Sequence, residues 1–301
     1  MPVRSFLLLA TLAALWGGSF AFMRYAVPAL GPVPLTFARV SLAAVVLFAI
    51  ALARGPARDI KTRWRDFLVI GILNSALPFS LFCFAEQYVT ASTAAILNAT
   101  SPFFGAAAAA IWLAEPLSMN KVGGMLVGFV GVVVLIGGHV DSVSRQVALA
   151  IAACLVAALC YGLAGVYVKR RLQGVSSMAL ACGSQLAAAI VLAPALPFTA
   201  VPGPVTPLVA ANVVALALGS TAVAYLIYFK LIADIGPSRA LTVTFLIPLF
   251  GVAWGVIFLG EPVTPGMAGG GALIVAGTAL ALRAGQTRSA AEPSICSRNS
   301  R

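Results

Sequence analysis

The sequence predicts an all-α membrane protein of ten transmembrane helices, arranged as two inverted repeats of five helices each. Three observations lead to this fold class. The 301 residues are 61% hydrophobic and only 9% charged, whereas soluble domains carry about 25% charged residues. The apolar residues are grouped in runs long enough to cross a bilayer, which takes ~20 residues. In addition, the second half of the chain repeats a sequence pattern of the first half.

Turn residues separate the apolar runs. Examples are the segments 31–34 (GPVP) and 235–238 (IGPS), both rich in glycine and proline. Each run is expected to be helical, because a helix satisfies its own backbone hydrogen bonds in lipid. The ten helices are predicted at 5–24, 33–53, 66–87, 91–113, 120–138, 147–168, 175–196, 207–230, 238–259 and 265–282.

The net charge of +11 is best explained by membrane topology, because the charges lie in short loops between apolar runs. Sixteen Lys and Arg residues fall in alternate connections or at the termini, and only Arg145 falls on the opposite side. Both termini are therefore predicted to be cytoplasmic, and the polar tail 284–301 is predicted to be disordered. The sixteen residues are Arg4, Arg54, Arg58, Lys61, Arg63, Arg65, Lys121, Lys169, Arg170, Arg171, Lys230, Arg239, Arg283, Arg288, Arg298 and Arg301.

An internal repeat appears when the chain is shifted against itself by 146 residues. Eleven of thirty positions are then identical: Pro102, Phe104, Gly105, Ala107, Ile111, Leu113, Glu115, Pro116, Gly123, Gly124 and Gly131 coincide with Pro248, Phe250, Gly251, Ala253, Ile257, Leu259, Glu261, Pro262, Gly269, Gly270 and Gly277. The repeat predicts two units, 1–140 and 141–283. Since each unit has five helices, the two units enter the membrane from opposite sides, an arrangement typical of transporters.

The repeated Glu-Pro pairs are predicted to be mainly structural. Pro116 and Pro262 end the helix before them. Glu115 and Glu261 are expected near the N-terminus of the following helix, where its dipole favours negative charge. A role of either glutamate in proton coupling is the alternative.

The chain resembles the EamA-type members of the drug/metabolite transporter superfamily. The resemblance lies in LWGGSFAFMRYA (15–26), in FARVSLAAVVL (37–47) and in the two P-x-F-G…L-x-E-P…G-G blocks. It covers about residues 5–283. The resemblance implies ten helices in two inverted repeats and the export of small metabolites or amino acids, without specifying which substrate.

Polar side chains at membrane depth usually face the interior of a helix bundle. They are the candidates for a substrate site, together with the repeat-equivalent aromatic residues Trp16 and Tyr161. The alternative is that the polar residues connect helices by hydrogen bonds and that the two aromatic residues serve packing. Proline at 102 and 248 is expected to interrupt its helix near mid-span and to free carbonyl groups there. The polar candidates are Asn74, Asn98, Thr221, Tyr225, Tyr228 and Thr244.

Two charged residues have two interpretations each. Arg39 lies about two turns inside the second predicted helix. It either extends to the external interface or provides a counter-charge for an anionic group of the substrate. Its repeat equivalent is Gln185, so the two halves differ here. Glu86 lies near the outer end of the third helix, as an interfacial residue or as a proton carrier.

The sequence thus favours a secondary transporter that exports a small metabolite or amino acid across the cell membrane. No glycine-rich phosphate loop is visible, so a substrate or ion gradient would drive transport, with protons as a candidate coupling ion. Uptake or exchange is the alternative within transport, and a membrane enzyme or a scaffold lies outside it. No catalytic residue, cofactor, metal site or nucleic-acid partner is predicted; the partners are the substrate and the lipid bilayer. The five cysteines lack the close spacing of metal ligands.

Overall fold

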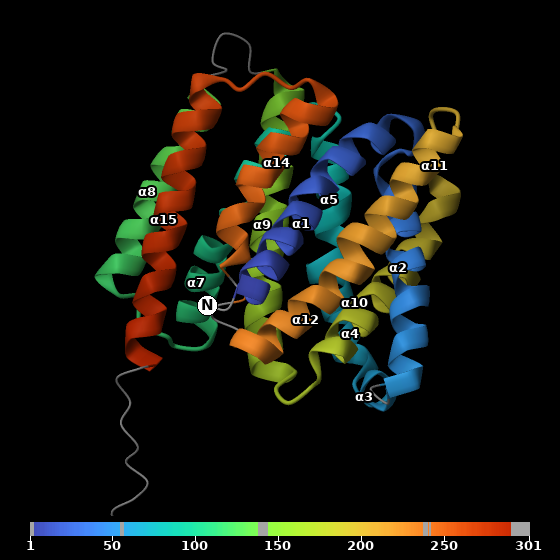
Figure 1. The fold of residues 1–301 in the computed structure, drawn as a ribbon, viewed down its shortest axis with the longest axis horizontal. Helices are drawn as coiled ribbons and strands as arrows, with labels where there is room; N and C mark the ends of the chain where they lie inside the picture. Colours follow the sequence, from blue (N-terminus) through green and yellow to red (C-terminus); the bar gives the residue numbers. More distant parts are fainter. Residues whose placement is uncertain (1–2, 55–56, 138–143, 237–239, 241, 290–301) are drawn as a thin grey trace, which may run out of the picture.

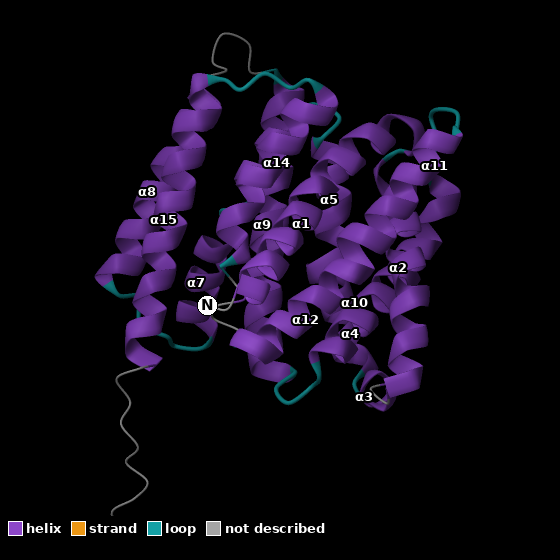
Figure 2. Ribbon diagram, viewed as in Figure 1, coloured by secondary structure: helices purple, strands orange, loops and turns teal. Residues whose placement is uncertain are grey.

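The computed structural model describes residues 3–54, 57–137, 144–236, 240 and 242–289. Every regular element within these residues is a helix, and no strand occurs among them (Figure 2). Large apolar side chains such as Leu126 and Phe129 are exposed on the outside of the bundle. An apolar exterior and a purely helical backbone are what a lipid environment demands.

The helices follow the predicted spans closely. The first half contains α1 (Val3–Leu30), α2 (Pro32–Arg54), α3 (Ala57–Thr62), α4 (Trp64–Gly71), η1 (Ile72–Ala76), α5 (Leu77–Ala85), α6 (Ala91–Asn98), α7 (Ser101–Trp112) and α8 (Met119–Gly137). The second half contains α9 (Arg145–Arg171), α10 (Ser177–Leu192), η3 (Ala193–Phe198), α11 (Pro207–Val214), η4 (Ala215–Val223), α12 (Ala224–Ile235), α14 (Val243–Leu259) and α15 (Pro265–Ser289). Most of the predicted tail, 290–301, lies outside the described residues.

Eight helices of the described chain are long and apolar enough to cross a membrane. The first runs from Val3 to Leu30 and the last from Pro207 to Ile235. Two further apolar helices, Val243–Leu259 and Pro265–Ala281, coincide with the ninth and tenth predicted spans but are shorter than these eight. Length and composition therefore support eight crossings, two fewer than the sequence predicts.

The two mid-span prolines behave differently. Around Pro102 the fourth span is divided, because α6 ends at Asn98 and α7 begins at Ser101. The predicted interruption at Pro248 is wrong, because α14 continues through it without a break. A proline removes one backbone donor, and packing against neighbouring helices compensates for that loss in a membrane bundle.

Two π-helical segments occupy equivalent positions in the two halves. They are η1 in the third span and η4 in the eighth span. A π-turn closes between residues i and i+5, so it holds one residue more than an α-turn and shifts the faces that follow. Periodicity in the sequence does not reveal such a shift.

The helices α8 and α15 lie side by side at one edge of the bundle (Figure 1). A Cβ atom on Gly124 would lie 2.5 Å from the carbonyl oxygen of Gly277, and one on Gly131 would lie 2.8 Å from that of Gly270. Only glycine permits so close an approach. The earlier glycine of α8 meets the later glycine of α15, so the helices run antiparallel. At the offset of 146, Gly124 corresponds to Gly270 and Gly131 corresponds to Gly277. The two contacts are therefore equivalent, with the roles of the two halves exchanged.

The same exchange relates two further helix crossings. Where α1 meets α14, a Cβ atom on Gly17 would lie 2.8 Å from the backbone nitrogen of Gly251. Where α9 meets α7, one on Gly162 would lie 2.5 Å from the backbone nitrogen of Gly105. Gly162 and Gly251 follow Gly17 and Gly105 by 145 and 146 residues. The halves therefore contact each other through the same positions in exchanged roles.

We expect Gly124→Ala to lower the melting temperature of the purified protein in detergent, relative to Gly123→Ala. Both changes improve helix propensity by about 1 kcal/mol. Only the first forces a methyl group against the backbone of α15, and such overpacking costs about 1–3 kcal/mol. The nearest atom to a Cβ on Gly123 is 3.8 Å away. Equal melting temperatures for the two variants would contradict the close backbone crossing.

Candidate functional site

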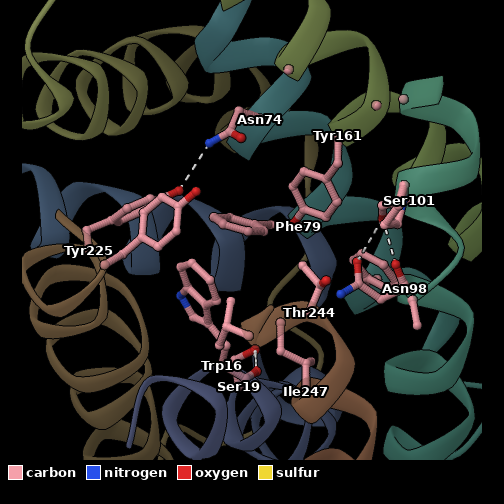
Figure 3. A pocket seen from close by; sticks show the side chains of 18 of the residues that line it. Trp16, Ser19, Asn74, Phe79, Asn98, Ser101, Tyr161, Tyr225, Thr244 and Ile247 are labelled. Carbon is pink, nitrogen blue, oxygen red and sulfur yellow. Dashed lines mark hydrogen bonds between the residues drawn. The ribbon is translucent and has the colours of Figure 1, made fainter. Parts of the chain in front are cut away.

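A cavity of about 530 Å³ lies between the two halves. This volume falls in the range of small-molecule sites. Side chains from both halves line it, and Figure 3 shows several of them converging on one space. Eight of the nine predicted site residues line the cavity: Trp16, Arg39, Asn74, Asn98, Tyr161, Tyr225, Tyr228 and Thr244. The ninth, Thr221, does not.

Aromatic rings form much of the wall. The ring of Trp16 on α1 meets Tyr225 edge-on at a centroid distance of 6.2 Å and Tyr228 at 5.3 Å. In the other half, Tyr161 on α9 stacks with Phe82 on α5 at 6.3 Å. At the repeat offsets, Trp16 corresponds to Tyr161 and Phe82 to Tyr228. The walls on the two sides are therefore equivalent in position and similar in chemistry.

The amide groups in the cavity are partly satisfied by neighbours. Asn74 on η1 donates a hydrogen bond of 3.1 Å to the hydroxyl of Tyr225, across the two halves (Figure 3). The Ser101 hydroxyl donates to the backbone carbonyl of Asn98 at 2.6 Å and lies 3.4 Å from its side-chain oxygen. Each amide still has hydrogen-bonding capacity that these contacts do not use. The polar groups combine with aromatic surface in a way that suits a small amphipathic molecule.

Arg39 lies inside the bundle and does not extend to the interface. Its side chain on α2 is 3% exposed, and its Nε donates to the hydroxyl of Thr221 at 3.0 Å. One terminal nitrogen lies 3.4 Å from the sulfur of Met23, and the guanidinium lies 3.6 Å from the ring centroid of Phe79. These contacts hold the guanidinium at the cavity wall without neutralising its charge.

Thr221 lies behind Arg39 instead of facing the cavity. The prediction placed Thr221 and Tyr225 on one face because α-helical residues four apart share a face. However, η4 is π-helical, and the Thr221 hydroxyl donates to the carbonyl of Leu216, five residues earlier. The extra residue in this turn brings Ser220 to the cavity in place of Thr221.

One end of the cavity reaches the surface beside Glu115 and Lys169. Both residues line the cavity, and their side chains are 32% and 62% exposed. Lys169 donates a hydrogen bond to Glu115, and the Lys121 ammonium lies 3.8 Å from the same carboxylate. The hydrogen bond from Lys169 lowers the pKa of Glu115 below its ordinary value. An ion pair therefore stands at the mouth.

The equivalent glutamate at the other end makes different contacts. Glu261 accepts hydrogen bonds from the backbone N–H groups of Ala91 and Ser92, at 2.7 and 2.9 Å, and from the Ser92 hydroxyl at 2.6 Å. The sequence predicts that Glu261 stabilises the N-terminus of the helix that follows it, α15. In the structure it instead caps the N-terminus of α6, in the other half. This cap joins the two halves beside the connection between α14 and α15, at the top of Figure 1.

The cavity lining includes neither Glu261 nor Glu86, so the end of the bundle where they lie is called the closed end. Glu86 is completely buried there. Neither of its carboxyl oxygens has a hydrogen-bonding partner among the described residues. Arg24 on α1 donates to the backbone carbonyl of Glu86 and not to its carboxyl group. Glu86 does not line the cavity, which Phe82 bounds one turn earlier on α5.

No group of three His, Cys, Asp or Glu side chains in the described part of the chain could hold a metal ion. The chemistry available in the cavity is that of one guanidinium, several hydroxyl and amide groups and aromatic surface, with an ion pair of Lys169 and Glu115 where the cavity reaches the surface. This set can bind and orient a small molecule.

Comparison with known proteins places the chain among transporters. It is 30% identical to the uncharacterized transporter YvbV of Bacillus subtilis, over 90% of this chain and 89% of that protein. It is 28% identical to a probable terminal-alkyne amino-acid exporter of Streptantibioticus cattleyicolor, over 92% and 94%. It is also 28% identical to an S-adenosylmethionine/S-adenosylhomocysteine transporter of Chlamydia trachomatis, over 85% and 82%.

A solved crystal structure with 21% sequence identity has the same fold, with a TM-score of 0.67 over 96% of this chain and 99% of that one. The profile of the EamA-like transporter family matches residues 4–137 and, a second time, residues 148–283. The resemblance seen in the sequence is therefore confirmed, and the chain belongs to the EamA-like transporter family.

Proposed function

We propose that the protein is a secondary transporter that exports a small metabolite or amino acid across the cytoplasmic membrane by alternating access. The observation that carries this proposal is the cavity between the halves, which reaches the surface beside Glu115 and Lys169 while Glu261 joins the halves at the other end. A site that is accessible from one end at a time is the requirement of alternating access.

The architecture we propose has ten crossings, with repeats at 1–140 and 141–283 in opposite membrane orientations and a polar tail at 284–301. The sequence offset of 146 supports it, and so do the glycine crossings that recur with exchanged halves. In this arrangement the two ends of the cavity are built from equivalent elements. Exchange of the conformations of the two halves then opens one end as it closes the other.

Export is favoured by the relative named as an amino-acid exporter. Exchange is the second candidate, because another relative is named for two substrates, S-adenosylmethionine and S-adenosylhomocysteine. Family and relatives are named as transporters, and a transporter is not an enzyme. Export would proceed into a medium without a counter-substrate, whereas exchange would need one.

Both termini are expected to be cytoplasmic, because the Lys and Arg residues are concentrated in alternate connections. A reporter that is active only in the cytoplasm should work when fused after Arg283 and should be inactive when inserted in the 199–206 connection. Activity in the connection combined with silence at the C-terminus would reverse the orientation.

Protons are the coupling ion that we propose, with Glu86 as the group that carries them. A carboxylate that is buried without a partner is costly, and protonation removes the cost. Its proton is exchanged with water when that end of the bundle opens. The charged and titratable groups around it are Arg24, Arg39, Glu261, Cys83 and Cys154.

Replacing Glu86 by Gln should keep the protein folded and should uncouple export from the pH gradient. Export by the wild type should slow when nigericin collapses that gradient in cells, whereas export by Glu86→Gln should be unaffected. Equal sensitivity of both proteins would exclude Glu86 as the coupling group.

Transport itself is tested by untargeted metabolite profiling of cells and medium, with and without the protein. The wild type should deplete one compound or compound class inside and enrich it outside. Asn98→Leu should remain in the membrane and lose export, because it removes a polar group from the cavity wall. Tyr225→Phe loses one hydrogen bond, worth about 1 kcal/mol, and should weaken export moderately. Absence of any enrichment with the wild type would contradict export.

A further inference from the structure

We propose that Arg39 binds a carboxylate group of the transported compound, so that the substrates are small organic acids or amino acids and not organic cations. This inference rests on the proposed transport function and assigns the substrate class of the same cavity. Three features of the structure support it: a buried charge without an ion-pair partner, a neutral counterpart of that charge in the other half, and a buried hydroxyl without a partner, the two absences being those among the described residues.

The guanidinium of Arg39 has no ion-pair partner among the described residues, and the buried carboxyl group of Glu86 acts on it only at a distance. No carboxylate of the described residues forms an ion pair with it, and its partners are a hydroxyl, a thioether and an aromatic ring. Burial of an unpaired charge lowers the stability of the folded protein. An arginine that is 3% exposed in the middle of a membrane bundle is therefore kept at a cost to stability. Binding of an anion would remove this cost.

The second half of the chain shows that the structure does not need the charge. At the offset of 146, Arg39 corresponds to Gln185 and Thr221 to Ser75. Gln185 donates its amide N–H to the Ser75 hydroxyl at 2.9 Å, just as Arg39 donates to Thr221 at 3.0 Å. The same contact between the halves is thus made twice, once by a neutral amide and once by a cation. The hydrogen bond between the halves therefore does not require the positive charge of Arg39.

Ser220 adds an unused donor in the same region. It lines the cavity and precedes Thr221, the residue that Arg39 contacts, yet its buried hydroxyl has no hydrogen-bonding partner among the described residues. Its repeat equivalent, Asn74, does have one, the hydroxyl of Tyr225. The residue equivalent to Tyr225 is Phe79, which has no hydroxyl to offer. An unsatisfied buried hydroxyl suggests a missing ligand, and a carboxylate accepts from both groups.

The remaining charges of the cavity favour a single carboxylate group on the ligand. Lys169 is the other cation in its lining, and it is paired with Glu115 at the mouth. Glu115 is also the only carboxylate of the described lining, so the deeper part offers no counter-charge to an amine. A carboxylate matches one guanidinium geometrically and in charge. The aromatic walls can accommodate the apolar part of the same molecule.

The test compares the metabolites exported by the wild type, Arg39→Gln and Arg39→Lys. Compounds enriched in the wild-type medium should carry a carboxylate. Arg39→Gln should reduce their export roughly tenfold or more, since a hydrogen bond to a charged group is lost. Arg39→Lys should retain part of it. The melting temperature of Arg39→Gln in detergent should equal or exceed that of the wild type, because glutamine serves in the equivalent place.

Three outcomes would overturn the inference. Enrichment by the wild type of compounds that lack a carboxylate would leave transport intact and exclude a carboxylate site. Loss of the Arg39→Gln protein from the membrane would show that the charge serves folding. Unchanged export by Arg39→Gln would place the anion elsewhere. Absence of wild-type export would instead remove the proposed function, and the inference with it.

Discussion

Polar groups inside a membrane bundle must find their partners within the bundle, and this constraint organises the whole structure. The backbone satisfies itself by forming helices throughout the described residues. Helices meet closely at glycines such as Gly124 and Gly277, where side chains would keep the backbones apart. Buried polar side chains pair across the halves, as Gln185 does with Ser75. Polar groups without a hydrogen-bonding partner are exceptions. Where such a group lies near the cavity, a bound ligand can supply the missing partner.

Because the chain is duplicated, each unpartnered polar group can be compared with the equivalent residue in the other half. Most contacts between the halves recur with exchanged roles, so a difference between equivalent positions is informative. The pair formed by Arg39 and Thr221 and the pair formed by Gln185 and Ser75 make the same contact, but only the first contains a charge. Likewise, Glu115 stands in an ion pair at the mouth, whereas its equivalent caps α6 at the closed end. The first difference concerns substrate chemistry, and the second distinguishes the two ends of the cavity.

The positions of the helices and eight residues of the cavity wall could be predicted from the sequence, because hydrophobic runs and repeated motifs are local signals. The exceptions depend on tertiary structure. Thr221 was predicted to face the cavity, but a π-turn shifts the faces of the eighth span by one residue. For the same reason the sequence did not indicate that Ser220 faces the cavity. The partner of Glu261 lies 170 residues away in the chain, in α6, and no local pattern indicates it. Pro248 remains helical because neighbouring helices support α14.

Alternating access predicts opposite movements at the two ends of the cavity, and distances between spin labels measure them directly. One pair of labels, at Leu117 and Gln173, would span the mouth, and a second pair, at Tyr88 and Val263, would report on the closed end. With the exported metabolite identified by profiling, its addition should lengthen the mean distance of one pair and shorten that of the other. Movement of both pairs in the same direction, or no change in a protein that still transports, would contradict the account.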